Sequence, residues 1–174
     1  MIKNVIFDIG NVLLDFCWKD HIARFGFQGE KADRIAQAMM LGPIWPKLDL
    51  GLESDEDILE QFVAHTPELE QEIRLVFSDL STIVREYEGS VDWIESLKAR
   101  GYHTYYLSNY GERIRREASK ELSFLSHMDG GIMSYTVHLA KPDPAIYQTL
   151  LDRYGLKAEE CVFLDDTVRN VEAG

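Results

Sequence analysis

The chain has 174 residues and a mass of 20.0 kDa, and 45% of its residues are hydrophobic, which is enough for one core and a small accessory lobe. Its net charge of −12 disfavours nucleic acid and anionic membranes as partners, because both attract clusters of Lys and Arg. The chain begins directly with a strand-like segment, has no apolar run of about 18 residues, and its two cysteines, Cys17 and Cys161, lack metal-site or disulfide spacing. We therefore expect a cytoplasmic globular protein, and nothing in the sequence indicates its oligomeric state.

The first predicted element is a strand at Val5-Ile6-Phe7, which ends at Asp8 and Gly10. A short continuous apolar run of this kind is typical of a strand that is buried on both faces of a parallel sheet. The first strand therefore predicts a parallel α/β sheet.

Residues 16–86 interrupt this pattern, because they contain helical periodicity over 32–41, 55–65 and 69–80 and no convincing strand. A turn-rich piece at 41–46 divides the segment, and Ser54 with Asp57 three residues later is typical of a helix N-cap. Its aromatic residues are expected in the core more than at a substrate entrance. We predict that residues 16–86 form an inserted helical cap.

Residues 87–174 alternate between helix and strand. Helical spacing from Val91 ends at Gly101, a second helix covers 144–154, and strand-like runs cover 102–107 and 161–164, with a weaker one at 131–135. Strands that alternate with helices predict a doubly wound, Rossmann-like α/β fold. Residues 1–15 and 87–174 would together form its core.

Polar residues follow each predicted strand, and ligands of open α/β sheets bind beyond the carboxyl ends of the strands. Asp8, Asp165 and Asp166 would supply three carboxylates that repel one another unless a cation such as Mg²⁺ lies among them. With Lys141 on the other side of a phosphoryl group, its negative charge would be neutralised enough for Asp8 to attack phosphorus. Ser108 could bind the remaining phosphoryl oxygens.

Four segments in this order resemble the signature motifs of the haloacid dehalogenase superfamily: Phe7-Asp8-Ile9-Gly10-Asn11-Val12-Leu13, Leu107-Ser108-Asn109, Lys141-Pro142-Asp143-Pro144 and Phe163-Leu164-Asp165-Asp166. The helical insertion after the first motif resembles the C1 cap of that superfamily. The Asp-x-Gly-Asn-Val form of the first motif resembles the subgroup that contains α-D-glucose-1-phosphate phosphatases.

The resemblance implies a Mg²⁺-dependent phosphatase that hydrolyses a small phosphorylated metabolite, with sugar phosphates among the candidates. Asp8 would be the nucleophile that is transiently phosphorylated. Ser108 would bind the phosphoryl group with Asn109 beside it, and Lys141 would neutralise the phosphoryl oxygens and orient Asp8.

The resemblance also implies a set of metal ligands. Asp8 and the backbone carbonyl of Gly10 would bind Mg²⁺, Asp166 would coordinate it directly, and Asp165 would ligate it or hold a metal-bound water.

The chain departs from the family at Gly10, where most phosphatases of the superfamily carry a second aspartate that acts as general acid/base. Loss of such a group costs roughly 10²- to 10⁴-fold in rate. Asp15 and His21 are two candidates to replace it.

Two alternatives stay open at this point. A 2-haloacid dehalogenase also attacks with an aspartate but expels halide, so it needs neither a proton donor nor a metal; the Asp165-Asp166 pair favours the phosphatase. A second alternative is a binding or regulatory module with little turnover, which is motivated by Gly10 and by the few residues after Asp166. The same shortness leads us to expect a truncated chain.

Overall fold

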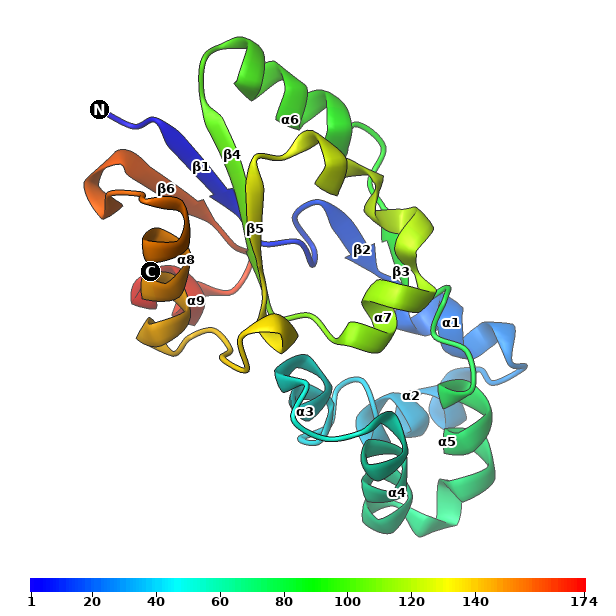
Figure 1. Cartoon of the computed structure of the whole chain (residues 1–174). Coiled ribbons are helices and arrows are strands. Elements are labelled where there is room, and N and C mark those ends of the chain that lie inside the picture. Colours follow the sequence, from blue (N-terminus) through cyan, green and yellow to red (C-terminus); the bar gives the residue numbers. More distant parts are fainter.

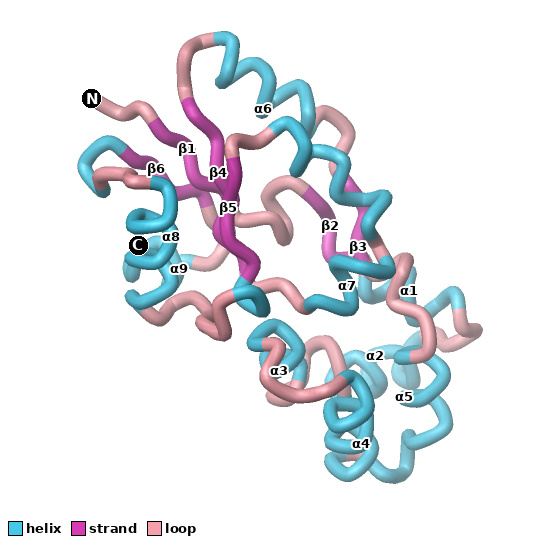
Figure 2. Tube along the Cα trace, in the orientation of Figure 1, coloured by secondary structure: helices cyan, strands magenta, loops and turns pink.

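The computed structural model describes residues 1–174 and has a four-stranded parallel sheet at its centre (Figure 1, Figure 2). The strand order is β5-β4-β1-β6, so β6 is an edge strand. The bounds are Asn4–Phe7 for β1, His103–Ser108 for β4, Gly130–Met133 for β5 and Cys161–Leu164 for β6. The predicted doubly wound α/β fold is confirmed.

Helices cover both faces of this sheet, because alternate side chains of each strand point to opposite sides. On one face, α6 (Ser90–Ala99) packs against β1, with the rings of Phe7 and Trp93 4.9 Å apart. On the other face, α8 (Pro144–Tyr154) packs its Ile146 and Leu150 against Ile6. Five further elements complete this part: the helices α7 (Glu112–Glu117) and α9 (Val168–Ala173) and the 3-10 helices Ser119–His127, Ser134–Thr136 and Ala158–Glu160.

Five helices between the first and second strands of the sheet form a separate bundle beyond the strand ends (Figure 1). We call this bundle the helical lobe; it consists of α1 (Trp18–Arg24), α2 (Gly29–Ala38), α3 (Trp45–Leu50), α4 (Asp55–His65), the 3-10 turn Pro67–Leu69 and α5 (Glu70–Phe77). The predicted cap at Ser54 is present, since its hydroxyl oxygen accepts the Asp57 N–H at 3.1 Å.

Two features of this segment differ from the sequence-based expectation. An antiparallel ribbon of β2 (Leu14–Phe16) and β3 (Val84–Glu86) joins the lobe to the sheet, although no strand was predicted within 16–86. Three residues are too few to show the alternation of a strand. Helix α3 begins inside the predicted turn-rich piece. Pro46 is compatible with this helix because it lies in the first turn, where a missing N–H breaks no helical hydrogen bond.

The apolar core runs without interruption from the sheet into the helical lobe. Trp45 of α3 is 7% exposed, and its ring lies 6.1 Å from that of Phe16 in the ribbon and 6.2 Å from that of Phe62 in α4. Close packing on both sides fixes α3 directly over the carboxyl ends of the strands.

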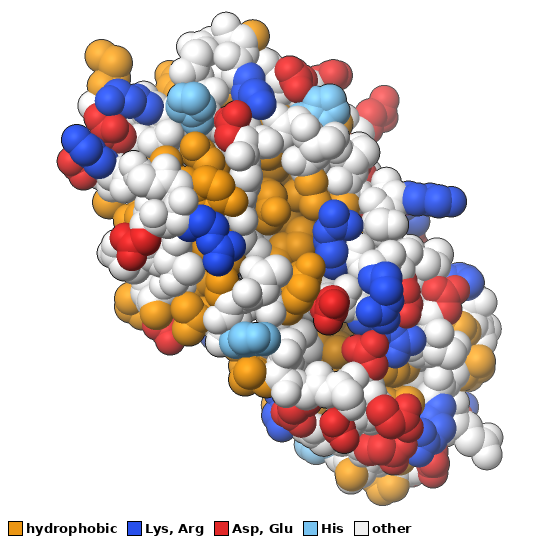
Figure 3. Space-filling view, viewed as in Figure 1, with side chains coloured by type: hydrophobic (Ala, Val, Ile, Leu, Met, Phe, Trp, Pro, Cys, Tyr) orange, Lys and Arg blue, Asp and Glu red, His pale blue; other side chains and the backbone are white.

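The surface reflects the acidic composition. In Figure 3, acidic side chains gather over the helical lobe, while apolar side chains are visible in the centre of the view, beside β5. None of the helices is both long and apolar enough to cross a membrane.

Candidate active site

The strand register brings the polar residues that follow β1, β4 and β6 to one edge of the sheet. Phe7 of β1 is paired with Tyr106 and with Leu164, and the Asp8 N–H donates to the Leu164 carbonyl at 2.7 Å. Asp8, Ser108 and Asp165 therefore emerge side by side, all of them buried or nearly so.

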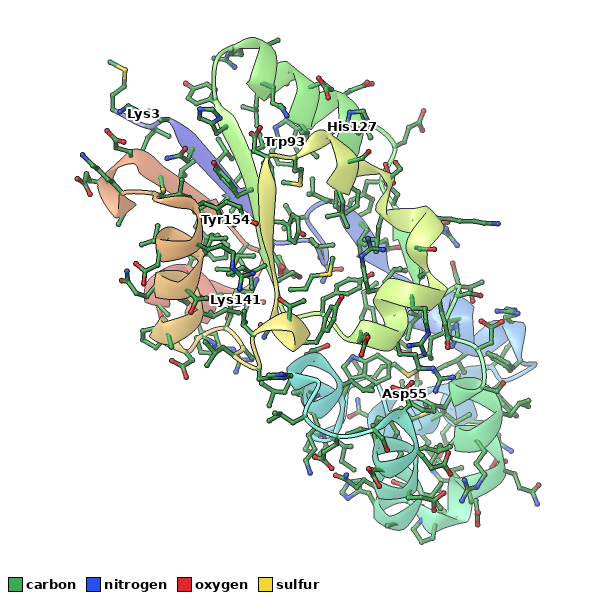
Figure 4. All side chains as sticks on the ribbon, in the orientation of Figure 1. Lys3, Asp55, Trp93, His127, Lys141 and Tyr154 are labelled. Atoms are coloured by element: carbon green, nitrogen blue, oxygen red, sulfur yellow. The ribbon has the colours of Figure 1, made fainter.

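Lys141 lies at the centre of this group, below the strand ends and next to α8 (Figure 4). Its ammonium Nζ is 2.9 Å from Asp8 Oδ1 and 2.5 Å from Asp165 Oδ2, and the residue is only 4% exposed. The side chain of Asn109 fixes the loop that carries Lys141, because its amide donates to the Lys141 carbonyl at 3.0 Å and accepts the Lys141 N–H at 2.8 Å. One buried cation is thus shared by two buried carboxylates.

Asp165 has a full set of hydrogen-bond donors. Besides Lys141, it accepts the Thr167 N–H at 2.8 Å and the side-chain amide of Asn170 at 3.1 Å on both oxygens. These contacts hold the carboxylate in place, so Asp165 orients the lysine that faces Asp8.

Asp166, in contrast, is exposed and has no cation partner. It accepts hydrogen bonds only from the Asn11 amide at 3.0 Å and the Thr167 hydroxyl at 3.3 Å. Asn11 is in the left-handed region, with φ 55°, which asparagine tolerates better than most residues. Asp166 therefore offers a charged carboxylate toward the pocket.

The donor set fits a hard divalent cation. One oxygen each from Asp8, Asp165 and Asp166 can be chosen so that all three lie within 4.8 Å of one another, and Gly10 lines the same pocket. Three carboxylates face one ammonium, which leaves uncompensated negative charge that Mg²⁺ with its oxygen preference would balance.

The electrostatics of Asp8 depend on this positive charge. Burial raises the pKa of Asp8, while Lys141 and a hydrogen bond from Ser108 lower it and the neighbouring Asp165 raises it again. Ser108 itself is 2% exposed, so its hydroxyl is held close to Asp8. A carboxylate in this position stays ionised only while cations surround it.

A cavity of about 200 Å³ opens over Asp8 and is closed on its far side by the helical lobe. Its walls come from the strand ends, the ribbon, α3 and α7: Asp8, Gly10, Asn11, Leu14, Phe16, Trp45, Asp49, Val84, Asn109, Tyr110, Ile114, Asp166 and Thr167. The sequence did not single out Asp49, Tyr110 or Thr167, because no motif marks them and only the packing of α3 brings Asp49 here.

The two sequence candidates for an acid/base group are not among the residues that line this cavity. Asp15 lies on β2, where its carboxylate accepts the Cys17 thiol at 3.2 Å. His21 is fully buried in the helical lobe, and its ring nitrogens contact the Thr82 hydroxyl at 2.9 Å and the Val76 carbonyl at 3.3 Å.

Comparison with known proteins gives one family. The model of the haloacid dehalogenase-like hydrolases matches residues 2–174. (S)-2-haloacid dehalogenase 1 from a Pseudomonas species is 24% identical over 182 aligned residues, which cover 98% of this chain and 78% of that protein. (S)-2-haloacid dehalogenase 4A from Burkholderia cepacia is 31% identical over 78 residues, which is 45% of this chain and 34% of that protein.

Solved structures show the same fold. A HAD family enzyme from Bacteroides thetaiotaomicron, determined in complex with magnesium and inorganic phosphate, has a TM-score of 0.73 and 20% sequence identity to this chain. The match covers 99% of this chain and 89% of that one.

Proposed function

This chain belongs to the haloacid dehalogenase-like hydrolases, and from that premise we propose that it is a Mg²⁺-dependent phosphatase acting on a small phosphomonoester. The observation that carries the proposal is the cluster of Asp8, Asp165 and Asp166, from each of which one carboxylate oxygen lies within 4.8 Å of the others, while a single ammonium, that of Lys141, pairs with the first two. A metal site supplies the missing positive charge, and the phosphoryl group supplies the ligand that such a site would bind.

In the proposed reaction Asp8 attacks phosphorus and forms an aspartyl-phosphate, which water then hydrolyses. Lys141, 2.9 Å from Asp8, holds the nucleophile and neutralises the phosphoryl oxygens, while Ser108 binds one of them and Asn109 keeps the lysine loop in place. Fixed donors of this kind stabilise the charge that develops in the transition state.

The proposed Mg²⁺ ligands are Asp8, the Gly10 carbonyl and Asp166, with Asp165 as a further ligand or as the holder of a metal-bound water. When bound, Mg²⁺ neutralises phosphoryl oxygens and orients the group for attack. The Bacteroides enzyme that shares the fold binds magnesium and phosphate, which supports this assignment.

We propose further that residues 16–86 act as a cap over a core of residues 1–15 and 87–174. A cavity of about 200 Å³ supports a small metabolite such as a sugar phosphate as the substrate. The first-motif resemblance to glucose-1-phosphate phosphatases supports the same class.

A second candidate is a 2-haloacid dehalogenase, which the two curated relatives favour. That reaction uses the same aspartate but expels halide without a metal. The two functions differ in their need for Asp166, which the phosphatase would use as a metal ligand and which a dehalogenase, needing no metal, would leave without that role.

A substrate screen separates the two. Wild-type protein and Asp8→Asn would be given a panel of sugar and alkyl phosphates and 2-chloropropionate, each with Mg²⁺ or with a chelator. We expect phosphate release that requires Mg²⁺ and falls by about 10⁴-fold or more in Asp8→Asn, because the nucleophile is lost.

Asp33→Asn, which changes an exposed acid on α2, serves as the matched control and should keep wild-type activity. Chloride release without added metal would contradict the phosphatase proposal and support the dehalogenase. Full phosphatase activity in Asp8→Asn would contradict the aspartyl-phosphate route.

A further inference from the structure

The proposed phosphatase reaction leaves one chemical role without a residue. A sugar or alkyl alcohol is a poor leaving group unless it is protonated as the P–O bond breaks, and the position two residues after Asp8 is Gly10, which has no side chain. The strand-end side of the cavity offers only Asp8 and Asp166 as acids, and both are engaged in the proposed attack and metal site. Any proton donor must therefore come from another wall.

Asp49 lies on the opposite wall of the same cavity, contributed by α3 of the helical lobe. It is half-buried, and its carboxylate makes no hydrogen bond and no ion pair within the protein. Buried and half-buried acids are normally paired, so an acid without a partner in a small cavity points to a ligand group as its partner.

The backbone of Asp49 is held firmly by the sheet side of the molecule. The fully buried Ser134 hydroxyl donates to the Asp49 carbonyl and accepts the Tyr110 N–H at 2.9 Å. The next carbonyl, that of Leu50, contacts Nδ1 of His138 at 2.8 Å. Gly51 then ends α3 with φ 61°, so close to Tyr135 that a side chain there would clash at 2.9 Å. The carboxyl group is thus positioned while its oxygens stay free.

A second residue with an unpartnered polar group lines the same cavity. The hydroxyl of Tyr110, which is 5% exposed, has no hydrogen-bond partner. Burial raises the pKa of Tyr110, so its O–H stays protonated. Asp49 and Tyr110 therefore both line the cavity, and neither has its polar side-chain group paired within the protein.

The charges around Asp49 suit proton transfer near neutral pH. The pKa of Asp49 is raised to about 7; burial is the largest cause, the negative charge of Asp8 acts in the same direction, and Lys141 opposes both. The other titratable groups on the cavity wall are Tyr110 and Asp166, while Lys47 of α3 is paired with Glu53 at 3.4 Å. An acid with a pKa near the working pH can both give and take a proton.

From this placement we infer that Asp49 is the general acid/base of the site and stands in for the aspartate that Gly10 replaces; the inference rests on the proposed phosphatase function. The acid/base group would thus be supplied by α3, across the cavity from Asp8, and not by the first motif.

The protons balance over one cycle. Asp8 forms a bond to phosphorus while the bond from phosphorus to the alcohol oxygen breaks, and neutral Asp49 gives its proton to that oxygen. The Asp49 carboxylate then takes a proton from water as the water oxygen bonds to phosphorus and the bond from phosphorus to Asp8 breaks. Inorganic phosphate leaves, with Asp8 ionised and Asp49 protonated again.

The test compares leaving groups in Asp49→Asn, which is isosteric and keeps the backbone contacts. With an alkyl phosphate and Mg²⁺, kcat/KM should fall about 10²- to 10⁴-fold, because the alkoxide leaves unprotonated. With 4-nitrophenyl phosphate, formation of the aspartyl-phosphate should change by less than about 10-fold, since that anion leaves without a proton. A burst of one 4-nitrophenol per enzyme should then precede slow turnover, because hydrolysis lacks its base.

Two further variants complete the test. Asp49→Glu, which keeps a carboxyl group, should recover part of the lost rate with the alkyl phosphate, and Asp33→Asn on the same lobe should behave as wild type. Equal loss with both leaving groups, or loss with neither, would overturn the role of Asp49 while the phosphatase proposal stands. If the wild type released no phosphate from any ester, the proposed function would fail and the role of Asp49 would fail with it.

Discussion

Buried titratable groups have different surroundings at the strand ends and in the helical lobe. At the strand ends, Asp8, Lys141 and Asp165 are buried together, and a lysine within 3 Å of both acids opposes the effect of burial. In the helical lobe, Asp49 and His21 have no charged partner, and burial raises the pKa of Asp49 and lowers that of His21, so it favours the neutral form of each.

The difference indicates that the two walls have different chemical roles. A charged, interlocked wall suits a nucleophile and a cation, because both need fixed opposite charges. An uncharged wall with free polar atoms suits proton transfer and contact with a leaving group. Substitutions in the charged wall, at the Ser134 contact that joins α3 to the sheet side, and inside the lobe should therefore have different effects.

The largest effect on stability is expected for Lys141→Met. Two buried carboxylates would lose their shared cation, and breaking a buried pair in this way costs about 3–5 kcal/mol in the free energy of unfolding. Urea unfolding without Mg²⁺ would measure it. Lys3→Met, which removes an exposed partner of Glu160, is the control and should change stability little. Equal effects for both lysines would show that the charged wall is not interlocked.

A smaller effect on stability is expected at the Ser134 contact that joins α3 to the sheet side. Ser134→Ala removes the hydroxyl that links the Asp49 carbonyl to the Tyr110 N–H and leaves two buried backbone groups without partners. We expect a loss of about 1–3 kcal/mol in the free energy of unfolding. Ser126→Ala, an exposed serine that donates to the Ser123 carbonyl, should cost much less. An unchanged unfolding midpoint in Ser134→Ala would mean that the Ser134 contact does not hold α3 in place.

The smallest effect concerns pH and the lobe interior. Burial lowers the pKa of His21 below its ordinary value of 6.5, so below that pH the unfolded chain binds more protons than the folded one. The free energy of unfolding should therefore fall as the pH falls from 6.5, by no more than about 1.4 kcal/mol per pH unit from this group. His21→Gln should flatten this part of the curve of stability against pH. An identical slope in both proteins would contradict a neutral, buried His21.

Most of the strand-end wall could be predicted from the sequence because Asp8, Ser108 and Asp165 each lie at the carboxyl end of an apolar strand; Lys141, in the loop before α8, could be assigned only from its motif. Once β1, β4 and β6 are parallel neighbours, Asp8, Ser108 and Asp165 must meet at one edge. The weaker strand β5 was also predicted, although it ends at Met133 instead of Tyr135.

The lobe wall could not be predicted in the same way. Asp49 reaches the cavity through tertiary packing of Trp45 and the contact with Ser134, which lies 85 residues further along the chain. The two sequence candidates, Asp15 and His21, were close to the first motif in sequence, yet β2 and α1 direct them away from the cavity. Closeness to the first motif in sequence therefore does not predict which side chains of the following ribbon and helix reach the cavity.

The most direct test of the account is to trap the phosphorylated enzyme. Protein mixed with 4-nitrophenyl phosphate and Mg²⁺ would be quenched in acid within the first turnover and digested for mass spectrometry. The account predicts one added phosphoryl group on the peptide that contains Asp8, absent in Asp8→Asn and accumulating to a higher level in Asp49→Asn. Turnover without any phosphorylated peptide, or a phosphoryl group on another residue, would contradict it.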